Sequence, residues 1–334
     1  MAISTKSNDW ICLFILSFVI CLLYVNTDPI PTPNSQSANH IPAIIIQSAV
    51  AKGAVCLDGS PPAYHFSPGK DEDASNWLIY LQGGGWCTSN DAYSTPDFSV
   101  QSCPNRAAGE LGSSVNMKLF EFTGFFGTNE NDTYFYKWNR VVIRYCDGGS
   151  FAGDVEKPDP VTKLYYRGAR IFEVVVDELM AKGMNAAKNV IFAGGSAGGL
   201  GVLVHCDNFT SRFPKGVRVK CLSDCSLFLV VKDPRHAKFF NSVFRDVVAL
   251  HVIILSSSPP GLYFKQQIIS ALPHSSPTKG FIVTSHFGHS FAIKYYKKKM
   301  FADQNSKTIE SAFYDWYFDQ DAVNLIDPSN MPYY

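Results

Sequence analysis

A short glycine-rich segment restricts the fold of this chain more than any other feature. Residues 194–198 read Gly-Gly-Ser-Ala-Gly and match the pattern G-x-S-x-G. The apolar run 189–193 before it is typical of a buried strand, and the small and apolar residues of 197–206 after it are typical of a helix. A strand that turns sharply into a helix needs small residues at the turn, because larger side chains would collide across it. The segment therefore predicts a strand–turn–helix unit that presents Ser196.

Similar blocks recur along the chain. Short apolar runs of strand type alternate with longer stretches whose apolar residues have helical spacing. Strands are predicted at 77–81, 140–145, 189–193, 219–222 and 281–284, and helices at 168–182, 197–206, 239–251 and 308–318. This alternation favours an α/β fold with a mainly parallel sheet flanked by helices.

The N-terminal residues differ from the rest of the chain. An uncharged apolar run spans residues 10–25, and a stretch rich in proline, serine and asparagine follows it. We interpret residues 1–25 as a secretory signal peptide, with an uncleaved signal anchor as the alternative because the run is long for a signal core. Residues 26–41 are then a linker, and 42–334 form one α/β domain. No stable membrane partner is expected unless the leader is uncleaved.

The cysteines also point to export. Outside the leader the chain has Cys56, Cys87, Cys103, Cys146, Cys206, Cys221 and Cys225. Cysteines in an oxidising compartment usually pair, and seven is an odd number, so at least one has no partner within the chain. Glycosylation sequons at Asn131 and Asn208 fit the same compartment. The sequence therefore predicts a secreted, extracellular protein.

The charge balance excludes some partners. Lys+Arg and Asp+Glu number 29 each, which gives a formal net charge of zero, and no basic block is present. A nucleic-acid partner is not expected, because it would need a basic patch. The sequence lacks an HExxH motif and paired-cysteine ligand spacing, so neither a metal nor another cofactor is expected.

The G-x-S-x-G pattern makes Ser196 the candidate nucleophile of an acyl-transfer site. The segment Gln82-Gly83-Gly84-Gly85-Trp86 directly follows the strand at 77–81, upstream of the serine, where an oxyanion loop is expected. Glycines let backbone N–H groups come close to a developing oxyanion. We expect the N–H groups of Gly85 and Trp86 to act together with that of Ala197.

The other members of a catalytic triad are less well marked. A base is expected on a loop after the last strand, and either His286 or His289 fits that position. The acid should lie between the nucleophile and the base, yet no Asp or Glu occurs between Asp246 and His289. Asp224 is the single candidate at the end of a predicted strand, whereas Asp233 and Asp246 lie in a predicted loop and helix.

Several segments resemble the plant pectin acetylesterases, which are close relatives of the Notum-type carboxylesterases. The similar segments are CLDGSPPAYHF (56–66), YLQGGGWC (80–87), WNRVVIRYCDGGSFAGDVE (138–156), RGARIFEVVVDELMAKGM (167–184), GGSAGGLGVLVHCDNF (194–209) and DWYFDQ (315–320). The resemblance runs from about Pro42 to Ile326. It implies an α/β-hydrolase-like fold and an activity that removes acetyl esters from galacturonan, so that acetylated pectin in the cell wall is the expected partner.

The resemblance also implies roles for particular residues. Ser196 matches the family's nucleophile and His289 its catalytic histidine, while Gly85, Trp86 and Ala197 match its oxyanion hole. Bridges between Cys87 and Cys103 and between Cys206 and Cys221 are implied in the same way.

The late part of the chain departs from the family pattern and is truncated. The missing stretch falls between Gln267 and Gly280 and would carry the triad acid, so that residue is unknown and Asp224 is a weak fallback. His286 and Ser290 stand where the family has two cysteines, and Cys225 replaces a small residue. Loss of the acid can cost about 10⁴ in kcat.

Three functions remain open at this point. The first is a serine esterase acting on pectin acetyl esters, impaired by the missing acid. The second is a catalytically inactive paralogue that binds wall polysaccharide. The third is a lipid-directed carboxylesterase of the Notum type, which would need a deep apolar acyl pocket.

Overall fold

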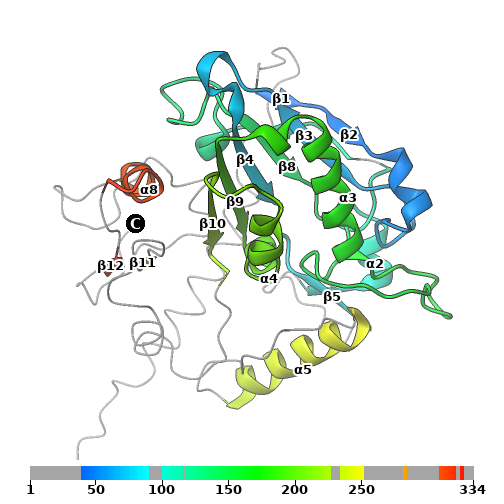
Figure 1. The fold of residues 1–334 in the computed structure, drawn as a ribbon. Coiled ribbons are helices and arrows are strands. Elements are labelled where there is room, and N and C mark those ends of the chain that lie inside the picture. Colours follow the sequence, from blue (N-terminus) through cyan, green and yellow to red (C-terminus); the bar gives the residue numbers. More distant parts are fainter. Residues whose placement is uncertain are drawn as a thin grey trace, which may run out of the picture.

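The computed structural model describes residues 39–89, 100–115, 117–226, 234–251, 281–283, 308–320 and 324–326. Its centre is a six-stranded sheet with the order β10-β9-β4-β8-β3-β2 (Figure 1). The strands are β2 (Ala43–Ile45), β3 (Ala63–Ser67), β4 (Asn76–Leu81), β8 (Asn139–Ile143), β9 (Asn189–Gly195) and β10 (Arg218–Asp224). Strands β10, β9, β4 and β8 are parallel, whereas β3 and β2 are antiparallel additions. The predicted mainly parallel sheet is confirmed.

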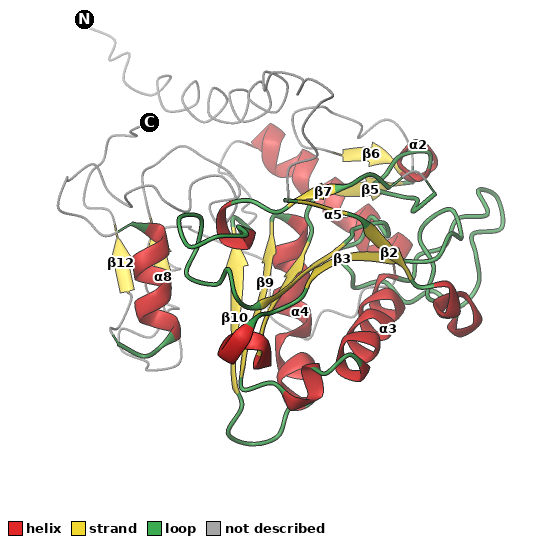
Figure 2. Cartoon of the chain, turned by 90° about the horizontal axis from the view of Figure 1, so that it is seen from above, coloured by secondary structure: helices red, strands yellow, loops and turns green. Residues whose placement is uncertain are grey.

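Both faces of the sheet are covered, because successive side chains of a strand point to opposite faces. On β4, Trp77 and Ile79 belong to the cluster beneath α3 (Gly168–Ala181) and α4 (Ala197–Ser211). Leu78 and Tyr80 belong to the opposite cluster, which contains the aromatic side chains of α8 (Ile309–Tyr317). Figure 2 shows α3 and α4 on the same side of the strands.

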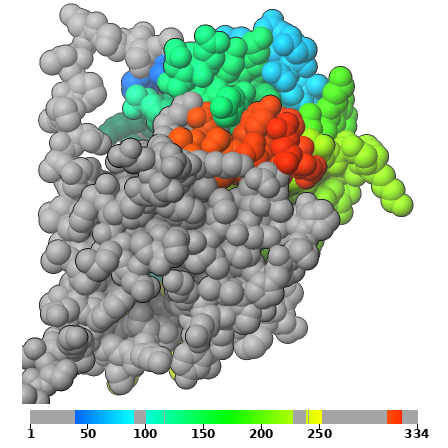
Figure 3. Space-filling model, turned by 90° about the vertical axis from the view of Figure 1, so that its left-hand side faces the viewer, coloured from blue at the N-terminus to red at the C-terminus, as the bar shows by residue number. Residues whose placement is uncertain are grey.

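Helix α8 joins a segment that lies far from it in the sequence. Phe313 packs edge-on against Phe125 at 5.1 Å between ring centroids, and Tyr314 lies 4.7 Å from Tyr134. In the space-filling view α8 appears as a red-orange band directly against green segments from the first half of the chain (Figure 3). The Lys220 side chain, on the edge strand β10, also binds α8 through the Trp316 carbonyl. Helix α8 therefore completes the core beside β10.

The remaining elements are short, except for the 18-residue helix α5. They are β1 (His40–Ile41), β5 (Trp86–Thr88), β6 (Val100–Ser102), β7 (Phe120–Glu121), β11 (Phe281–Val283), β12 (Asn324–Ile326), α2 (Cys103–Ala107), α5 (Pro234–His251), and the 3-10 turns η1 (Gln47–Lys52), η2 (Asp71–Ser75), η5 (Gly124–Phe126) and η6 (Met184–Ala186). Every predicted strand and helix is present with shifted ends. Strand β8 ends at Ile143 rather than 145, whereas β10 and α5 are longer than predicted.

Three disulfides cross-link the described chain. Cys87–Cys103 and Cys206–Cys221 are the pairs that the family resemblance implied, and Cys56–Cys146 is a third that was not predicted. Cys225 stands outside these three pairs, in agreement with the odd count.

No helix within the described ranges combines the length and apolar character needed to cross a bilayer. The predicted signal peptide at 1–25, its alternative as an anchor, and all but the last residues of the linker at 26–41 lie outside the described residues.

Candidate active site

Ser196 occupies a turn of one residue between β9 and α4. Its backbone has φ 53° and ψ −124°, a combination that L-residues rarely adopt. The serine is half-buried, and its N–H donates to the carbonyl oxygen of Asp224 at 2.9 Å. Such a strained conformation persists only where the surrounding structure fixes it. The result is a serine presented at the N-terminus of a 15-residue helix.

Glycines on either side of Ser196 make this turn possible. A Cβ atom on Gly194 would lie 2.4 Å from the carbonyl oxygen of Gly198. A Cβ atom on Gly198 would lie 2.1 Å from the carbonyl oxygen of Leu81 at the end of β4. Both distances are too short for any side chain, which is the collision that the sequence pattern predicted.

The glycine segment after β4 lies against the serine. Leu81 is paired in register with Gly194, so the two strands end side by side. A Cβ atom on Gly83 would lie 2.3 Å from the carbonyl oxygen of Gly195 and 3.0 Å from Cβ of Ser196. The backbone of Gly83 is therefore in direct contact with the turn. Sequence analysis placed Gly83 in the glycine segment but assigned it no role of its own.

The residues predicted as oxyanion donors lie in the glycine segment and at the start of α4. Gly84 and Gly85 have φ of +142° and +65°, which favours glycine at both positions. Trp86 begins β5, and Ala197 is the buried first residue of α4. The N-terminus of α4 adds N–H groups that have no partner within the helix, together with the positive end of the helix dipole. Such an arrangement is suited to binding a negatively charged oxygen.

A buried turn at residues 145–151 lies beside the glycine segment. The carboxylate of Asp147 accepts hydrogen bonds from the N–H groups of Gly149 and Phe151, both at 3.0 Å. Burial raises the pKa of Asp147 to about 6, and the two backbone hydrogen bonds act in the opposite direction. Sequence analysis used this segment for the family resemblance but assigned it no role.

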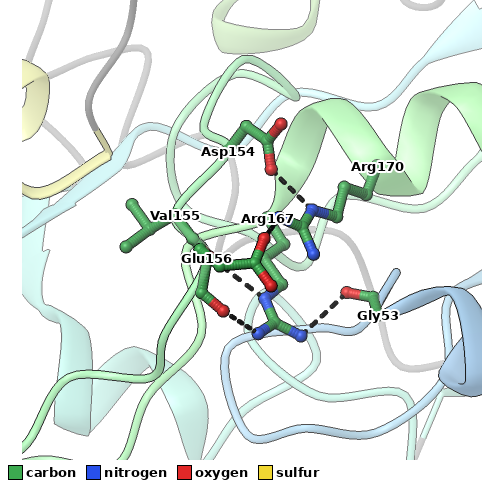
Figure 4. A network of polar contacts seen from close by, with 6 residues as sticks. All are labelled: Gly53, Asp154, Val155, Glu156, Arg167 and Arg170. Carbon is green, nitrogen blue, oxygen red and sulfur yellow. Dashed lines mark hydrogen bonds and ion pairs between the residues drawn. The ribbon is translucent and has the colours of Figure 1, made fainter.

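The chain beyond this turn is fixed by two arginines at the start of α3 (Figure 4). Arg170 donates to the carboxylate of Asp154 at 2.5 Å and also pairs with Glu156. Arg167 donates to the carbonyl oxygens of Val155 and Gly53, each at 3.1 Å. The loop that follows the Asp147 turn is thus held by side chains from a neighbouring helix.

Asp224 lies next to the serine turn. It ends β10 in register with Gly195 and is largely buried. A Cβ atom on Gly195 would lie 2.1 Å from the Tyr80 hydroxyl and 4.0 Å from the Asp224 carboxylate. Burial raises the pKa of Tyr80 well above its usual range, and the Asp224 charge contributes to that shift.

The other predicted triad members are placed elsewhere or not described. Asp246, on α5, accepts hydrogen bonds from the backbone and side chain of Ser89. Asp233, His286 and His289 lie outside the described residues, as does the predicted truncation at 267–280.

One group of side chains in the described ranges has the donor types of a metal site. It consists of Cys87, Cys103 and His251, whose ligand atoms lie within 4.8 Å of one another. The two sulfur atoms are joined in a disulfide, so neither is available as a thiolate ligand.

Comparison with known families identifies the chain. The family model described as Pectinacetylesterase matches residues 34–260. The chain belongs to the pectinacetylesterase family. The match to this family includes Ser196 and the glycine segment and ends before the histidine-bearing segment 285–290. The resemblance to the pectin acetylesterases that the sequence motifs indicated is thereby confirmed.

Individual members of the family are close in sequence. Pectin acetylesterase 11 and pectin acetylesterase 7 of Arabidopsis thaliana are 43% and 44% identical to the chain over 242 residues. In both comparisons the match covers 70% of this chain and 59% of the relative. The chain therefore spans about three fifths of the length of these pectinacetylesterase relatives.

Notum proteins are more distant relatives of this pectinacetylesterase-family chain. Human palmitoleoyl-protein carboxylesterase NOTUM is 30% identical over 196 residues, which is 56% of this chain and 37% of the human protein. The structure of the Wnt deacylase Notum from Drosophila superposes with a TM-score of 0.68 at 18% identity, covering 88% of this chain and 97% of the other. This likeness shows that the fold is α/β-hydrolase-like, as predicted.

Proposed function

We propose that this chain is a serine esterase that hydrolyses acetyl esters of cell-wall pectin. The observation that carries the proposal is the turn at Ser196, where a serine with a positive φ directly precedes helix α4 and lies against the backbone of Gly83. Membership of the pectinacetylesterase family supports the acetyl ester as substrate.

The proposed reaction follows the general scheme of serine esterases. The Ser196 hydroxyl attacks the acetyl carbonyl while His289 accepts its proton, and the sugar alcohol leaves as His289 returns a proton to it. Water then attacks the acetyl–serine ester, and acetate is released. The N–H groups of Gly85, Trp86 and Ala197 stabilise the oxyanion in both steps. Loss of one such donor typically costs about 10²–10³ in kcat.

The triad acid decides how fast the proposed reaction can run. A carboxylate normally holds the imidazole in the correct tautomer, and replacing it can cost about 10⁴ in kcat while the oxyanion hole still acts. Asp224 is the fallback for this role, because it lies at the end of the strand next to the serine turn. We therefore expect the chain to be an active but impaired esterase.

We also propose that the protein is secreted to the cell wall. The three disulfides support an oxidising compartment. Asn131 and Asn208, the acceptors of the two sequons, are both exposed, as glycosylation requires. The leader at 1–25 would direct the export.

The test is an assay of ester hydrolysis by the purified chain, measured as release of p-nitrophenol or acetate. Substrates are p-nitrophenyl acetate, acetylated homogalacturonan and a p-nitrophenyl palmitoleate ester, and Ser196→Ala is the control. Turnover of both acetyl substrates that disappears in the variant supports the proposal. If a folded chain binds pectin without turnover, it is the inactive wall-binding paralogue. Preference for the long acyl ester would favour the lipid-directed alternative.

A further inference from the structure

Tyr145 lies at the centre of a group of buried hydrogen bonds beside the glycine segment. Its hydroxyl donates to the carbonyl oxygen of Gly85 at 2.8 Å and accepts from the N–H of Ser150 at 2.9 Å. Its own backbone N–H donates to the side-chain oxygen of Gln82 at 3.1 Å. The ring is completely buried, and the guanidinium of Arg106 lies 5.0 Å from its centroid. The side chain therefore has little freedom to move.

The hydrogen bond from Tyr145 to the Gly85 carbonyl also affects the direction of the Trp86 N–H. The carbonyl of Gly85 and the N–H of Trp86 belong to one planar trans peptide, so they point in opposite directions. A donor that fixes the carbonyl also fixes the N–H. Gly85 has a φ of +65°, and glycine restricts its own backbone less than any other residue. A restraint on this peptide from outside the segment therefore limits its rotation, in addition to the pairing of Trp86 with Val100 of β6.

A second contact restrains the same peptide from its other end. The indole N–H of Trp86 donates to the hydroxyl oxygen of Ser150 at 2.9 Å. The next residue, Cys87, donates its backbone N–H to the carbonyl of Gly148 at 3.1 Å. Burial raises the pKa of Tyr145 well above its usual range, so its hydroxyl keeps the proton that it donates. Residues 145–150 thus form a rigid support for the Gly85–Trp86 peptide.

We propose that Tyr145 is a positioning residue of the esterase, which holds the Gly85–Trp86 peptide of the predicted oxyanion segment in place by binding the Gly85 carbonyl. The inference rests on the proposed function, because it assigns this peptide to the oxyanion hole. Tyr145 does not touch the substrate itself. Its effect is on the transition state, where the oxyanion forms, and not on the binding of the ester.

The test compares Tyr145→Phe with Tyr64→Phe. The Tyr64 hydroxyl is also buried and also hydrogen-bonded, to Glu178 at 3.4 Å, but it lies on β3, away from the serine turn. For each variant, kcat and KM on p-nitrophenyl acetate are measured together with the melting temperature. Hydrogen–deuterium exchange is followed over residues 82–88. We expect Tyr145→Phe to lower kcat by about 10-fold or more with little change in KM, and to speed exchange in this segment. Tyr64→Phe should change neither kcat nor the exchange over residues 82–88.

A second variant keeps the inference testable if Tyr145→Phe folds poorly. Ser150→Ala removes the acceptor of the Trp86 indole, and it should also lower kcat and speed exchange over 82–88. If both residues restrain one peptide, the double variant should lose less activity than the product of the two single losses. Unchanged exchange in both single variants, or unchanged kcat in both, overturns the inference even where the wild type is an active esterase. A wild type without turnover defeats the proposed function instead, and exchange alone then decides whether Tyr145 holds the loop.

Discussion

The carbonyl oxygen of Asp224 accepts a 2.9 Å hydrogen bond from the N–H of Ser196. This bond continues the pairing of β10 with β9 by one residue and joins the edge strand to the serine turn. It contributes to holding the serine at a φ of 53°. Two segments separated by 28 positions in the sequence thus cooperate in one conformation.

The same relationship makes Asp224 the residue to test as triad acid. Asp224→Asn keeps the shape and the backbone bond but removes the negative charge. We expect kcat on p-nitrophenyl acetate to fall by about 10²-fold or more, because the imidazolium of His289 would lose its counter-charge. The matched control is Asp246→Asn, since Asp246 binds Ser89 on a different element. Equal kcat in wild type and Asp224→Asn would remove Asp224 from the mechanism.

The close contact at Gly83 predicts a steric effect. In Gly83→Ala the new methyl group would lie 2.3 Å from the carbonyl oxygen of Gly195, so the glycine segment must shift away from Ser196. We expect a destabilisation of about 1–3 kcal/mol, typical of overpacking, and a loss of most of the turnover. Urea denaturation and the acetate assay measure the two effects.

Gly109→Ala is the control for this substitution. The nearest atom to a Cβ at position 109 is the Arg106 carbonyl oxygen at 3.7 Å, which is an ordinary contact. It should leave stability and turnover close to those of the wild type. If Gly83→Ala behaves like Gly109→Ala, the glycine segment is not packed against the serine as described.

His251 predicts how stability depends on pH. It is fully buried at the end of α5, and both ring nitrogens lack a hydrogen-bond partner among the described residues. Burial, helped by the charge of Arg106, lowers the pKa of His251 to about 3. Between pH 3 and the ordinary value of 6.5 the unfolded chain therefore binds a proton that the folded chain does not. The free energy of unfolding should rise with pH in this window and level off above it, by roughly 1.4 kcal/mol per pH unit from this group.

Replacing His251 isolates its contribution. His251→Leu cannot bind a proton, so its advantage over the wild type should grow as the pH falls from 6.5 to 5. Asp147 acts with the opposite sign, because a pKa raised to about 6 gives stability that is lost as pH rises from about 4 to 6. That contribution is common to both proteins and cancels in the difference. Parallel curves of unfolding free energy against pH for the two proteins would disprove the assignment to His251.

The sequence predicted the elements whose pattern is local. Strand β4 contains a continuous apolar run, helix α3 has apolar residues at helical spacing, and the serine turn has a recognisable motif. Strands β2 and β5 have three residues each, too few to show a period, and were missed, whereas the equally short β11 was predicted from the apolar run 281–284. Strand β3 was missed because it contains the polar residue His65. This side chain is buried and forms a hydrogen bond with the backbone carbonyl of Ile41.

Contacts between distant segments were beyond prediction. The bond from Tyr145 to Gly85 joins residues 60 positions apart, and no pattern in either segment indicates it. The disulfide Cys56–Cys146 spans 90 positions and was likewise missed, because seven cysteines allow many pairings. The pairs named in advance came from resemblance to a family, not from spacing.

Covalent labelling of the serine tests the central claim most directly. A fluorophosphonate reacts with an activated serine by forming a phosphorus–oxygen bond and releasing fluoride, and intact-protein mass spectrometry counts the adducts. We predict one adduct per folded chain, located at Ser196 by peptide mapping and absent from Ser196→Ala. A folded wild type that takes up no label, or one whose label persists in Ser196→Ala, would contradict the account.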